Sequence, residues 1–329
     1  MTVLVTGGAG YIGSHMVLGL LDSGLPVIVL DNLATGFRTA VPQSVPFFEG
    51  DIGDADMVSR LIESHAVDEV VHFAASSVVP ESVADPARYY TNNTVKSLAL
   101  IDAATRAGVR HFVFSSTAAV YGNPARMPVD EAALPQPMSP YGASKWMTEM
   151  LLHDVAKVRG MGYVVLRYFN VAGADPELRC GQSTRAATHL IKAAVQTALG
   201  LRDGLDIFGT DYPTSDGTCI RDYIHVTDLV GAHLSALECL RGGGASATLN
   251  CGYGKGYSVR EVVNAVKRIS ATDFPVRLSG RRAGDPAAIV ADTTKLRRKL
   301  NWVPTYDDLD TIVAHALAWE RRLLGMRVR

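Results

Sequence analysis

A glycine-rich segment directly after the first apolar run is the feature that most constrains the fold of this chain. Residues Thr6–Gly13 read Thr-Gly-Gly-Ala-Gly-Tyr-Ile-Gly, after the apolar run Val3–Thr6. Glycines at this spacing permit a tight turn from a strand into a helix, and they let backbone N–H groups approach a pyrophosphate. An apolar helical pattern continues to Leu21. The segment therefore predicts a dinucleotide site, with contacts from Gly7, Gly10, Tyr11, Ile12 and Gly13.

An acidic residue at the end of the second apolar run indicates which dinucleotide is bound. Asp31 follows the run Val27–Leu30 and lies 18 residues beyond Gly13. A carboxylate there can accept hydrogen bonds from both hydroxyls of the adenosine ribose, and it would repel a 2′-phosphate. Asp31, with its neighbour Asn32, therefore favours NAD over NADP. The alternative, that Asp31 only caps the following turn, leaves the agreement between strand, glycines and acid unexplained.

Short apolar runs alternate with helical patterns through the first half of the chain. Continuous β-branched and aromatic runs are typical of strands buried on both faces of a parallel sheet. We predict an α/β fold: a Rossmann-like, doubly wound parallel sheet with a smaller mixed α/β substrate domain. Residues 1–170 form the NAD-binding domain, which also receives about 222–250, and residues 171–329 mainly form the second domain. The strands are expected at Val3–Thr6, Val27–Leu30, Glu69–Ala74, His111–Ser115 and Tyr163–Tyr168.

Charge and cysteine content argue against several classes of partner. The 32 basic and 33 acidic residues nearly cancel, so we expect neither nucleic acid nor a membrane as a partner. Residues Thr2–Leu21 lack charge, but five glycines dilute their hydrophobicity and no basic segment precedes them, which argues against a signal peptide or a membrane span. The cysteines are widely spaced and form no CxxC pair, so we expect free thiols, no metal site and a cytoplasmic location. They are Cys180, Cys219, Cys239 and Cys251.

A tyrosine and a lysine at helical spacing form a second candidate site. Ser139 is a good N-cap and Pro140 suits the first helical position, so Tyr141 and Lys145 lie at i and i+4 on one helix face. A free phenol has a pKa near ~10, which is too high for a base at neutral pH. A nearby ammonium favours the phenolate and lowers that pKa. The pair is therefore predicted to be catalytic, and Lys145 can also hold the nicotinamide ribose.

Together these motifs resemble the extended short-chain dehydrogenase/reductase family, and within it the nucleotide-sugar 4-epimerases. The resemblance runs from about Thr2 to the helix near Trp319. It implies an isomerase that interconverts UDP-glucose and UDP-galactose by transient oxidation at C4 of the sugar, with NAD as the regenerated cofactor. The segments that carry it beyond the glycine turn are Ser115–Gly122, Arg167–Asn170, Ile207–Val226 and Arg281–Asp285.

The resemblance also implies roles for individual residues. Tyr141 would be the base for the 4-hydroxyl of the sugar, and Thr117 would hydrogen-bond the same oxygen. The UDP-sugar would also be bound by Asn170, His189, Leu190, Asp206, Phe208, Arg221, Arg282 and Asp285. Two arginines suit a diphosphate because each guanidinium can donate paired, charge-assisted hydrogen bonds. Tyr141 and Lys145 would also contact the cofactor, and the remaining cofactor contacts would come from Asp51, Ile52, Phe73, Ala74, Ala75, Asn92, Ser115 and Tyr168.

Two positions depart from the family pattern or leave the substrate open. Related epimerases often carry a lysine over the cofactor phosphates where this chain has Ser77, so retention of NAD rests more on backbone N–H groups. Ile289 corresponds to a position that shapes the hexose pocket, and an aliphatic side chain there leaves N-acetylated sugars open. UDP-pentoses and UDP-uronates also stay open, because the transferred proton and hydride are the same.

Other activities on this fold are weighed against the epimerase. Related 4,6-dehydratases place an Asp-Glu pair after the catalytic Thr, and decarboxylases of UDP-glucuronate tend to carry an acid there. This chain has Ala118 and Ala119, which cannot transfer protons. A non-catalytic NAD-binding regulator would commonly lack Tyr141 or Lys145, and both are present.

The resemblance carries two expectations about assembly and role. It implies a homodimer, formed by the helices near Val95–Thr105 and Lys145–Val158. The runs Ser77–Ser82 and Arg281–Pro286 are similar to bacterial epimerases linked to exopolysaccharide. The implied role lies in carbohydrate metabolism, either in galactose breakdown or in the supply of galactose units.

Overall fold

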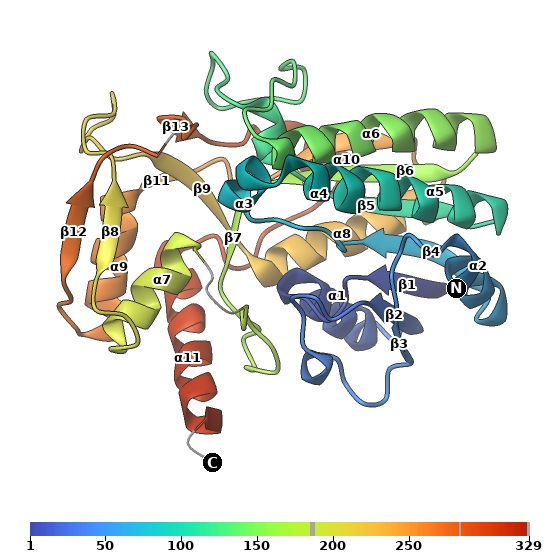
Figure 1. Cartoon of the computed structure of the whole chain (residues 1–329), viewed down its shortest axis with the longest axis horizontal. Helices are drawn as coiled ribbons and strands as arrows, with labels where there is room; N and C mark the ends of the chain where they lie inside the picture. The colour runs from blue at the N-terminus through green and yellow to red at the C-terminus, as the bar shows by residue number, and fades with distance from the viewer. Residues whose placement is uncertain (185–187, 283, 328–329) are drawn as a thin grey trace.

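Seven parallel strands form the central sheet of the protein (Figure 1). A computed structural model describes residues 1–184, 188–282 and 284–327; Ala283, inside one quoted motif, lies outside the described residues. The strand order is β10-β6-β5-β4-β1-β2-β3. The predicted doubly wound sheet is confirmed. The strands are β1 (Thr2–Thr6), β2 (Val27–Asp31), β3 (Phe47–Glu49), β4 (Val67–His72), β5 (His111–Thr117), β6 (Gly162–Tyr168) and β10 (Ala247–Cys251).

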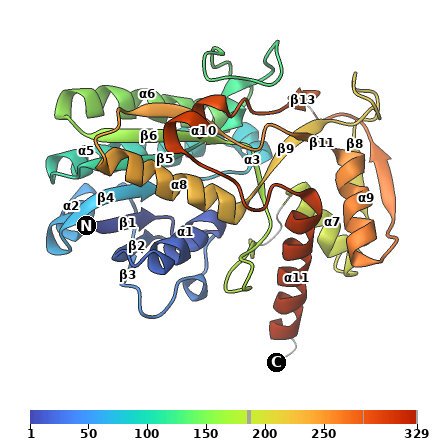
Figure 2. The ribbon, with the colours of Figure 1, turned by 180° about the vertical axis from the view of Figure 1, so that it is seen from behind.

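Helices cover both faces of this sheet because its central strands are apolar on both sides. Two hydrophobic clusters fill the two interfaces, one with Val17 and Leu229 and the other with Leu100 and Leu152. Figures 1 and 2 show the two helical layers from opposite sides. One layer has α1 (Tyr11–Asp22) and α8 (Val226–Arg241); the other has α2 (Ala55–Ser64), α5 (Lys96–Arg106) and α6 (Pro140–Arg159).

A smaller mixed part lies beyond the carboxyl ends of the strands (Figure 1). Its first sheet has the order β11-β9-β13 with β7 beside β9, and its second pairs β12 with β8. The carboxyl ends of the strands of the large sheet face this part. The chain returns to the large sheet through α8 and β10. The strands are β7 (Asn170–Ala172), β8 (Leu205–Phe208), β9 (Ile220–His225), β11 (Gly256–Ser258), β12 (Val276–Ser279) and β13 (Ala288–Ile289). The helices are α7 (Leu190–Ala198), α9 (Val259–Ser270) and α11 (Leu309–Arg327).

Short elements connect the longer helices and strands. Within the described ranges, no helix is long and apolar enough to cross a membrane. The short elements are η1 (Arg38–Ala40), α3 (Val79–Ala84), α4 (Pro86–Tyr89), the π-helical turn η2 (Tyr90–Val95), η3 (Ala118–Tyr121) and α10 (Thr294–Leu300).

Candidate active site

The glycine turn packs so closely that side chains are excluded from it. Gly7 has a φ of +73°, and a Cβ there would lie 2.5 Å from the backbone nitrogen of Ala74. A Cβ on Gly13 would lie 2.2 Å from the carbonyl oxygen of Gly7. The glycines therefore add no side chain that would cover the N-terminus of α1, whose first N–H groups lie at the carboxyl end of β1. This cradle fits the pyrophosphate of a dinucleotide.

Gly13→Ala is expected to lower the affinity for NAD at least about tenfold, because the new methyl group must push the turn away from the start of α1. Equilibrium dialysis with NAD measures the loss. Gly231→Ala is the matched control, since a Cβ at that position of α8 would meet only Trp302 Nε1, at 3.7 Å. Equal affinities in the two variants would contradict the assignment of the turn to the cofactor.

Asp31 ends β2 with its carboxylate held against the glycine turn. Oδ2 accepts the Ala9 N–H at 2.9 Å, and Oδ1 accepts the Leu33 N–H at 2.8 Å. Burial raises the pKa of Asp31, and the two backbone hydrogen bonds oppose that rise. Each carboxylate oxygen keeps acceptor capacity beyond these bonds, since an ionised carboxylate offers about four lone-pair sites. The group is therefore oriented to accept hydrogen bonds from ribose hydroxyls.

The predicted cofactor residues after the next strands lie at the same edge of the sheet. The Phe73 N–H donates to Thr6 O at 2.9 Å, which places Phe73–Ala75 beside the glycine turn. Asp51 accepts from Lys96 Nζ at 2.5 Å and from the Gly53 N–H at 2.8 Å. Burial raises the pKa of Asp51, but the hydrogen bonds from Lys96, Gly53 and Asn32 together with the Lys96 charge outweigh it, and the pKa is lowered. Asn32 accepts the Ala34 N–H at 3.1 Å.

Two asparagines hold the segment where this chain lacks the lysine of related epimerases. Asn93 makes paired hydrogen bonds to the backbone of Ser76, accepting from its N–H at 2.8 Å and donating to its carbonyl at 2.9 Å. Asn92 Nδ2 donates to Ser76 Oγ at 3.0 Å. The segment before Ser77 is thus fixed by amide groups. Asn93 and Lys96 were not singled out from the sequence, although Asn93 directly follows a predicted contact residue.

The three predicted catalytic side chains come together between α6 and β5. Ser139 Oγ accepts the Gly142 N–H at 3.2 Å, so the predicted N-cap is confirmed and the helix begins at Pro140. This start turns Tyr141 and Lys145 toward β5, where they are 8% and 3% exposed. Lys145 Nζ donates to the Ser115 carbonyl at 3.0 Å.

Thr117 at the end of β5 is oriented toward Tyr141. Its Oγ accepts the Ala119 N–H at 3.1 Å, which leaves the hydroxyl proton to donate. Burial raises the pKa of Tyr141, and the hydrogen bond from Thr117 lowers it. Burial lowers the pKa of Lys145 to about 7, while Glu149 raises it. Because burial acts against both charged forms, a phenolate and an ammonium at these positions would stabilise each other.

Predicted substrate residues gather on the strands of the smaller part. The Arg282 guanidinium carbon lies 3.8 Å from the centre of the Phe208 ring. On β9, Arg221 Nη2 is 3.5 Å from Asp285 Oδ1. Asn170 on the adjacent strand β7 donates to the carbonyl of Asp222 at 3.4 Å. Two arginines, an aromatic face and an amide are thus held on or next to the strands of the smaller part.

The other three predicted substrate residues lie near this group with partners of their own. His189 Nδ1 accepts from Gln182 Nε2 at 2.9 Å, and Leu190 begins α7. Both residues and Asn170 line a cavity of about 50 Å³. Asp206 shares the partly exposed face of β8 with Phe208, and its carboxylate is 3.0 Å from Arg277 Nε. A substrate contact for Asp206 stays a prediction.

Comparison with known proteins shows sequence and structural similarity over nearly the full chain. The profile of the NAD dependent epimerase/dehydratase family matches residues 3–252. A UDP-glucose 4-epimerase of Azospirillum brasilense is 56% identical over 321 residues, which cover 98% of this chain and 92% of that protein. The structure of UDP-glucose 4-epimerase from Brucella ovis in complex with NAD has a TM-score of 0.94 and 45% identity, over 96% of this chain and 97% of that chain. The enzyme from Bifidobacterium longum in complex with NAD+ and UDP has a TM-score of 0.92 and 34% identity, with 98% of each chain covered.

A glycine cradle at the switch from strand to helix, with a buried tyrosine and lysine beyond it, defines a nicotinamide-dependent enzyme of the Rossmann type. More particularly, the chain belongs to the NAD dependent epimerase/dehydratase family.

Proposed function

We propose that this chain interconverts UDP-glucose and UDP-galactose, which is the activity of a UDP-glucose 4-epimerase. The observation that carries the proposal is the hydrogen bond between Thr117 and Tyr141 at the end of β5, with Lys145 Nζ donating to the Ser115 carbonyl beside it. In this proposal Arg221 and Arg282 would bind the diphosphate of the UDP-sugar, and Tyr141 would meet its 4-hydroxyl. A dinucleotide held at the glycine turn would supply the hydride acceptor for this reaction.

The chain's own residues supply acid–base chemistry and orientation. Bound NAD would supply the hydride acceptor for C4 of the sugar and the hydride donor for the return to the opposite face. Tyr141 Oη takes the proton of the 4-hydroxyl and later gives it back, and the Thr117 hydroxyl hydrogen-bonds the same sugar oxygen. The Lys145 ammonium favours the phenolate that this step needs. Arg221 and Arg282 hold the diphosphate, so the sugar can turn while the nucleotide stays bound.

Removal of water is disfavoured at this site. Thr117 is followed by Ala118 and Ala119, whose side chains have no proton to transfer. Ala118 is buried in an apolar cluster that also holds Ile289. A 4,6-dehydratase needs an acid and a base for the elimination, and these alanines supply neither. The arrangement supports reversible oxidation at C4 without elimination.

The first test is conversion of UDP-galactose by the purified protein without added NAD, with UDP-glucose separated by chromatography. Conversion supports both epimerisation and a retained cofactor. Activity that appears only when NAD is added keeps the epimerase and indicates weak retention near Ser77. No conversion under either condition, while UDP-N-acetylgalactosamine, a UDP-pentose or a UDP-uronate is converted, reassigns the substrate. No conversion of any of them points to a regulator.

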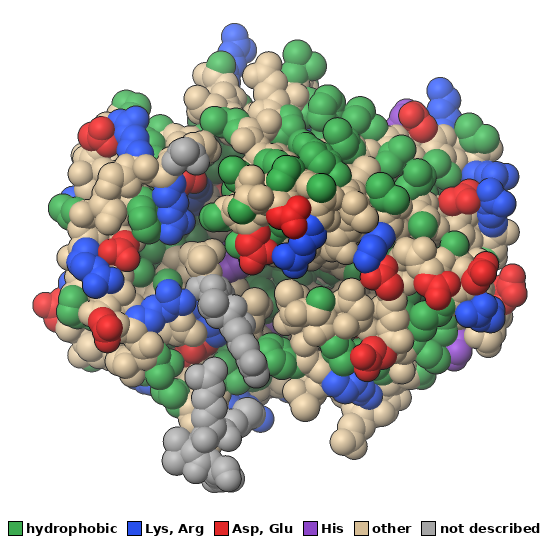
Figure 3. Space-filling view, viewed as in Figure 1, with side chains coloured by type: hydrophobic (Ala, Val, Ile, Leu, Met, Phe, Trp, Pro, Cys, Tyr) green, Lys and Arg blue, Asp and Glu red, His purple; other side chains and the backbone are tan. Residues whose placement is uncertain are grey.

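We also propose that the chain acts in the cytoplasm as a homodimer that pairs through α5 and α6. Hydrophobic side chains gather over the surface near α3, α5 and α6 (Figure 3). Among them, Val95 is 60% exposed, Met147 38% and Met150 42%. Apolar patches of this kind on a folded protein mark interaction surfaces.

Met150→Glu is expected to convert the dimer into a monomer, because a buried charge without a partner disfavours association. Light scattering coupled to size-exclusion chromatography measures the mass. Val303→Glu is the control, since Val303 is 79% exposed but lies outside this surface. A monomeric wild-type protein, or a dimer that survives Met150→Glu, would count against this interface.

A further inference from the structure

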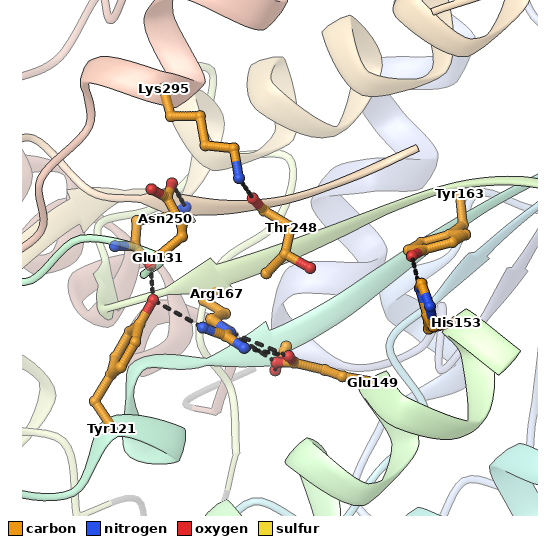
Figure 4. Close-up of polar contacts among 10 residues, drawn as sticks. Tyr121, Glu131, Glu149, His153, Tyr163, Arg167, Thr248, Asn250 and Lys295 are labelled. Carbon is orange, nitrogen blue, oxygen red and sulfur yellow. Dashed lines mark hydrogen bonds and ion pairs between the residues drawn. The ribbon is translucent and has the colours of Figure 1, made fainter. Parts of the chain in front are cut away.

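A chain of buried polar side chains runs behind the predicted catalytic residues (Figure 4). Glu149 lies one helical turn beyond Lys145 on α6 and is 6% exposed. Its carboxylate accepts from Arg167, with Nη2 to Oε2 at 2.6 Å and Nε to Oε1 at 3.0 Å. It also accepts from the hydroxyl of Ser116, the residue before Thr117 on β5. One carboxylate therefore joins α6, β5 and β6 directly behind the reacting groups.

The same series of hydrogen-bonded side chains continues beyond the large sheet. Arg167 Nη1 donates to Tyr121 Oη at 3.0 Å, and Tyr121 Oη donates to Asn250 Oδ1 at 2.6 Å. Asn250 Nδ2 donates to the Val129 carbonyl at 2.9 Å. The Val129 N–H in turn donates to the Val290 carbonyl at 2.8 Å. The hydrogen bonds thus run without interruption from the end of β5 to the residue after Ile289.

Stability alone does not account for this arrangement. A buried ion pair often contributes little or nothing compared with a well-packed apolar pair, because both charges lose their hydration. Its directional hydrogen bonds do fix geometry, since Arg167 Nε and Nη2 together hold both oxygens of the Glu149 carboxylate. A second buried pair offers a comparison. Glu69 on β4 accepts from Arg241 at the end of α8, and no hydrogen bond links that pair to Tyr141, Thr117 or Lys145 among the described residues.

We propose that Glu149, Arg167 and Tyr121 are positioning residues for the epimerase reaction. They hold the end of β5 against α6, and so fix Thr117 relative to Tyr141 and Lys145. They also tie this unit to the segment Ala288–Asp292, which carries Ile289 beside Ala118 and Tyr121. The sugar pocket and the catalytic groups are thereby held in a fixed position relative to each other. The inference rests on the proposed function and adds the residues that align its site.

Tyr121→Phe is the sharpest probe because it changes no charge and keeps the ring that lies 5.0 Å from the Arg167 guanidinium. The substitution interrupts the series of hydrogen bonds in the middle, where Asn250 loses a donor and Arg167 loses an acceptor. We expect kcat to fall about tenfold with KM for UDP-galactose within about twofold, since small displacements of reacting groups act on turnover. Glu149→Gln, which also leaves the Arg167 charge unbalanced, is expected to lose about a hundredfold in kcat.

Glu69→Gln is the matched control for Glu149→Gln, because it removes the charge from another buried glutamate that is paired with an arginine. Thermal unfolding of all variants reports stability. The proposal predicts that Glu69→Gln loses stability and keeps the wild-type kcat. If kcat follows thermal stability in the same way for both glutamine variants, or if folded Tyr121→Phe keeps the wild-type kcat, the proposal is wrong.

A second readout needs no substrate. The phenolate absorbance of Tyr141 is measured with NAD bound. It is the absorbance of the wild-type or Tyr121→Phe protein minus that of the same protein with Tyr141→Phe added. Tyr121→Phe is expected to raise the pKa of Tyr141 by about one unit, because Lys145 and Thr117 are held less closely. The groups facing Tyr141 and Lys145 are Glu149 on their own helix, Thr117 on β5, His72 on β4 and Tyr168 on β6; Tyr89 of α4 contacts the Tyr141 ring edge-on.

The two readouts separate the two proposals. A wild-type protein that leaves UDP-galactose unchanged contradicts the epimerase, and the phenolate titration then decides the positioning role by itself. An unchanged pKa of Tyr141 in Tyr121→Phe overturns the positioning role in that case. An active wild-type protein with unaffected variants overturns the positioning role and leaves the epimerase standing.

Discussion

Replacing Tyr141 with phenylalanine is expected to lower kcat for UDP-galactose about a thousandfold, because general acid–base groups contribute roughly 10²–10⁴ in rate. The ring stays in place, with its edge contact to Tyr89 at 6.5 Å between centroids. Only the hydroxyl that bonds to Thr117 is lost. The cradle at Gly7 and Gly13 is untouched, so the variant should bind NAD as the wild-type protein does.

Steady-state turnover by chromatography, together with equilibrium dialysis of NAD, measures both halves of this prediction. Tyr163→Phe is the control: its hydroxyl bonds only to His153 Nδ1, at 2.7 Å, in the interactions described, and lies at the far end of α6 (Figure 4). That variant should keep full activity. A Tyr141→Phe protein that turns over like wild type would remove the tyrosine from the mechanism. Loss of NAD together with activity would instead assign Tyr141 to cofactor binding.

The part of the fold that could be predicted from the sequence is encoded in contiguous residues. The turn at Gly7–Gly13 and the capped start of α6 at Ser139 each depend on neighbours a few positions away. The first strand and the central ones are apolar runs, so their burial on both faces is visible in the residue types. β3 has only three residues, and β10 includes the polar residues Thr248 and Asn250, so neither stands out as a continuous apolar run.

The polar chain behind the site could not be predicted for the opposite reason. Tyr121 and Asn250 are 129 residues apart, and they meet only because β10 pairs with β6. Glu149 looks like a solvated helix charge in the sequence, and only the fold shows that Arg167 faces it. Lys192 and Glu320, a buried pair between α7 and α11, are hidden in the same way. A charged residue carries no local mark of burial, because its partner is supplied by tertiary structure.

Lys145→Met is expected to lower kcat about a hundredfold or more, because the ammonium that assists the phenolate is lost. The same change is expected to stabilise the protein, because burial of the charged lysine costs folding free energy. Lys145 is 3% exposed, and burial lowers its pKa to about 7 from 10.5. Methionine has a similar length and no charge, so it fills the same space beside the Phe114 ring without that penalty. A residue kept for packing would show the reverse result, with loss of stability and little change in turnover.

The pH dependence of unfolding gives the same prediction a sign. Above about 7 and below 10.5, the unfolded chain binds a proton at Lys145 that the folded chain does not. The destabilising contribution of this lysine is therefore full below about 7 and fades as pH rises toward 10.5. Urea unfolding of the NAD-free proteins should show the greatest advantage for Lys145→Met at low pH and a shrinking one as pH rises. Lys157→Met, on the exposed face of the same helix, should unfold in parallel with wild type. A stability difference between Lys145→Met and the wild type that is absent, or that grows with pH, would mean that burial of Lys145 does not destabilise the folded protein. The proposal that this lysine lowers stability while it assists catalysis would then be wrong.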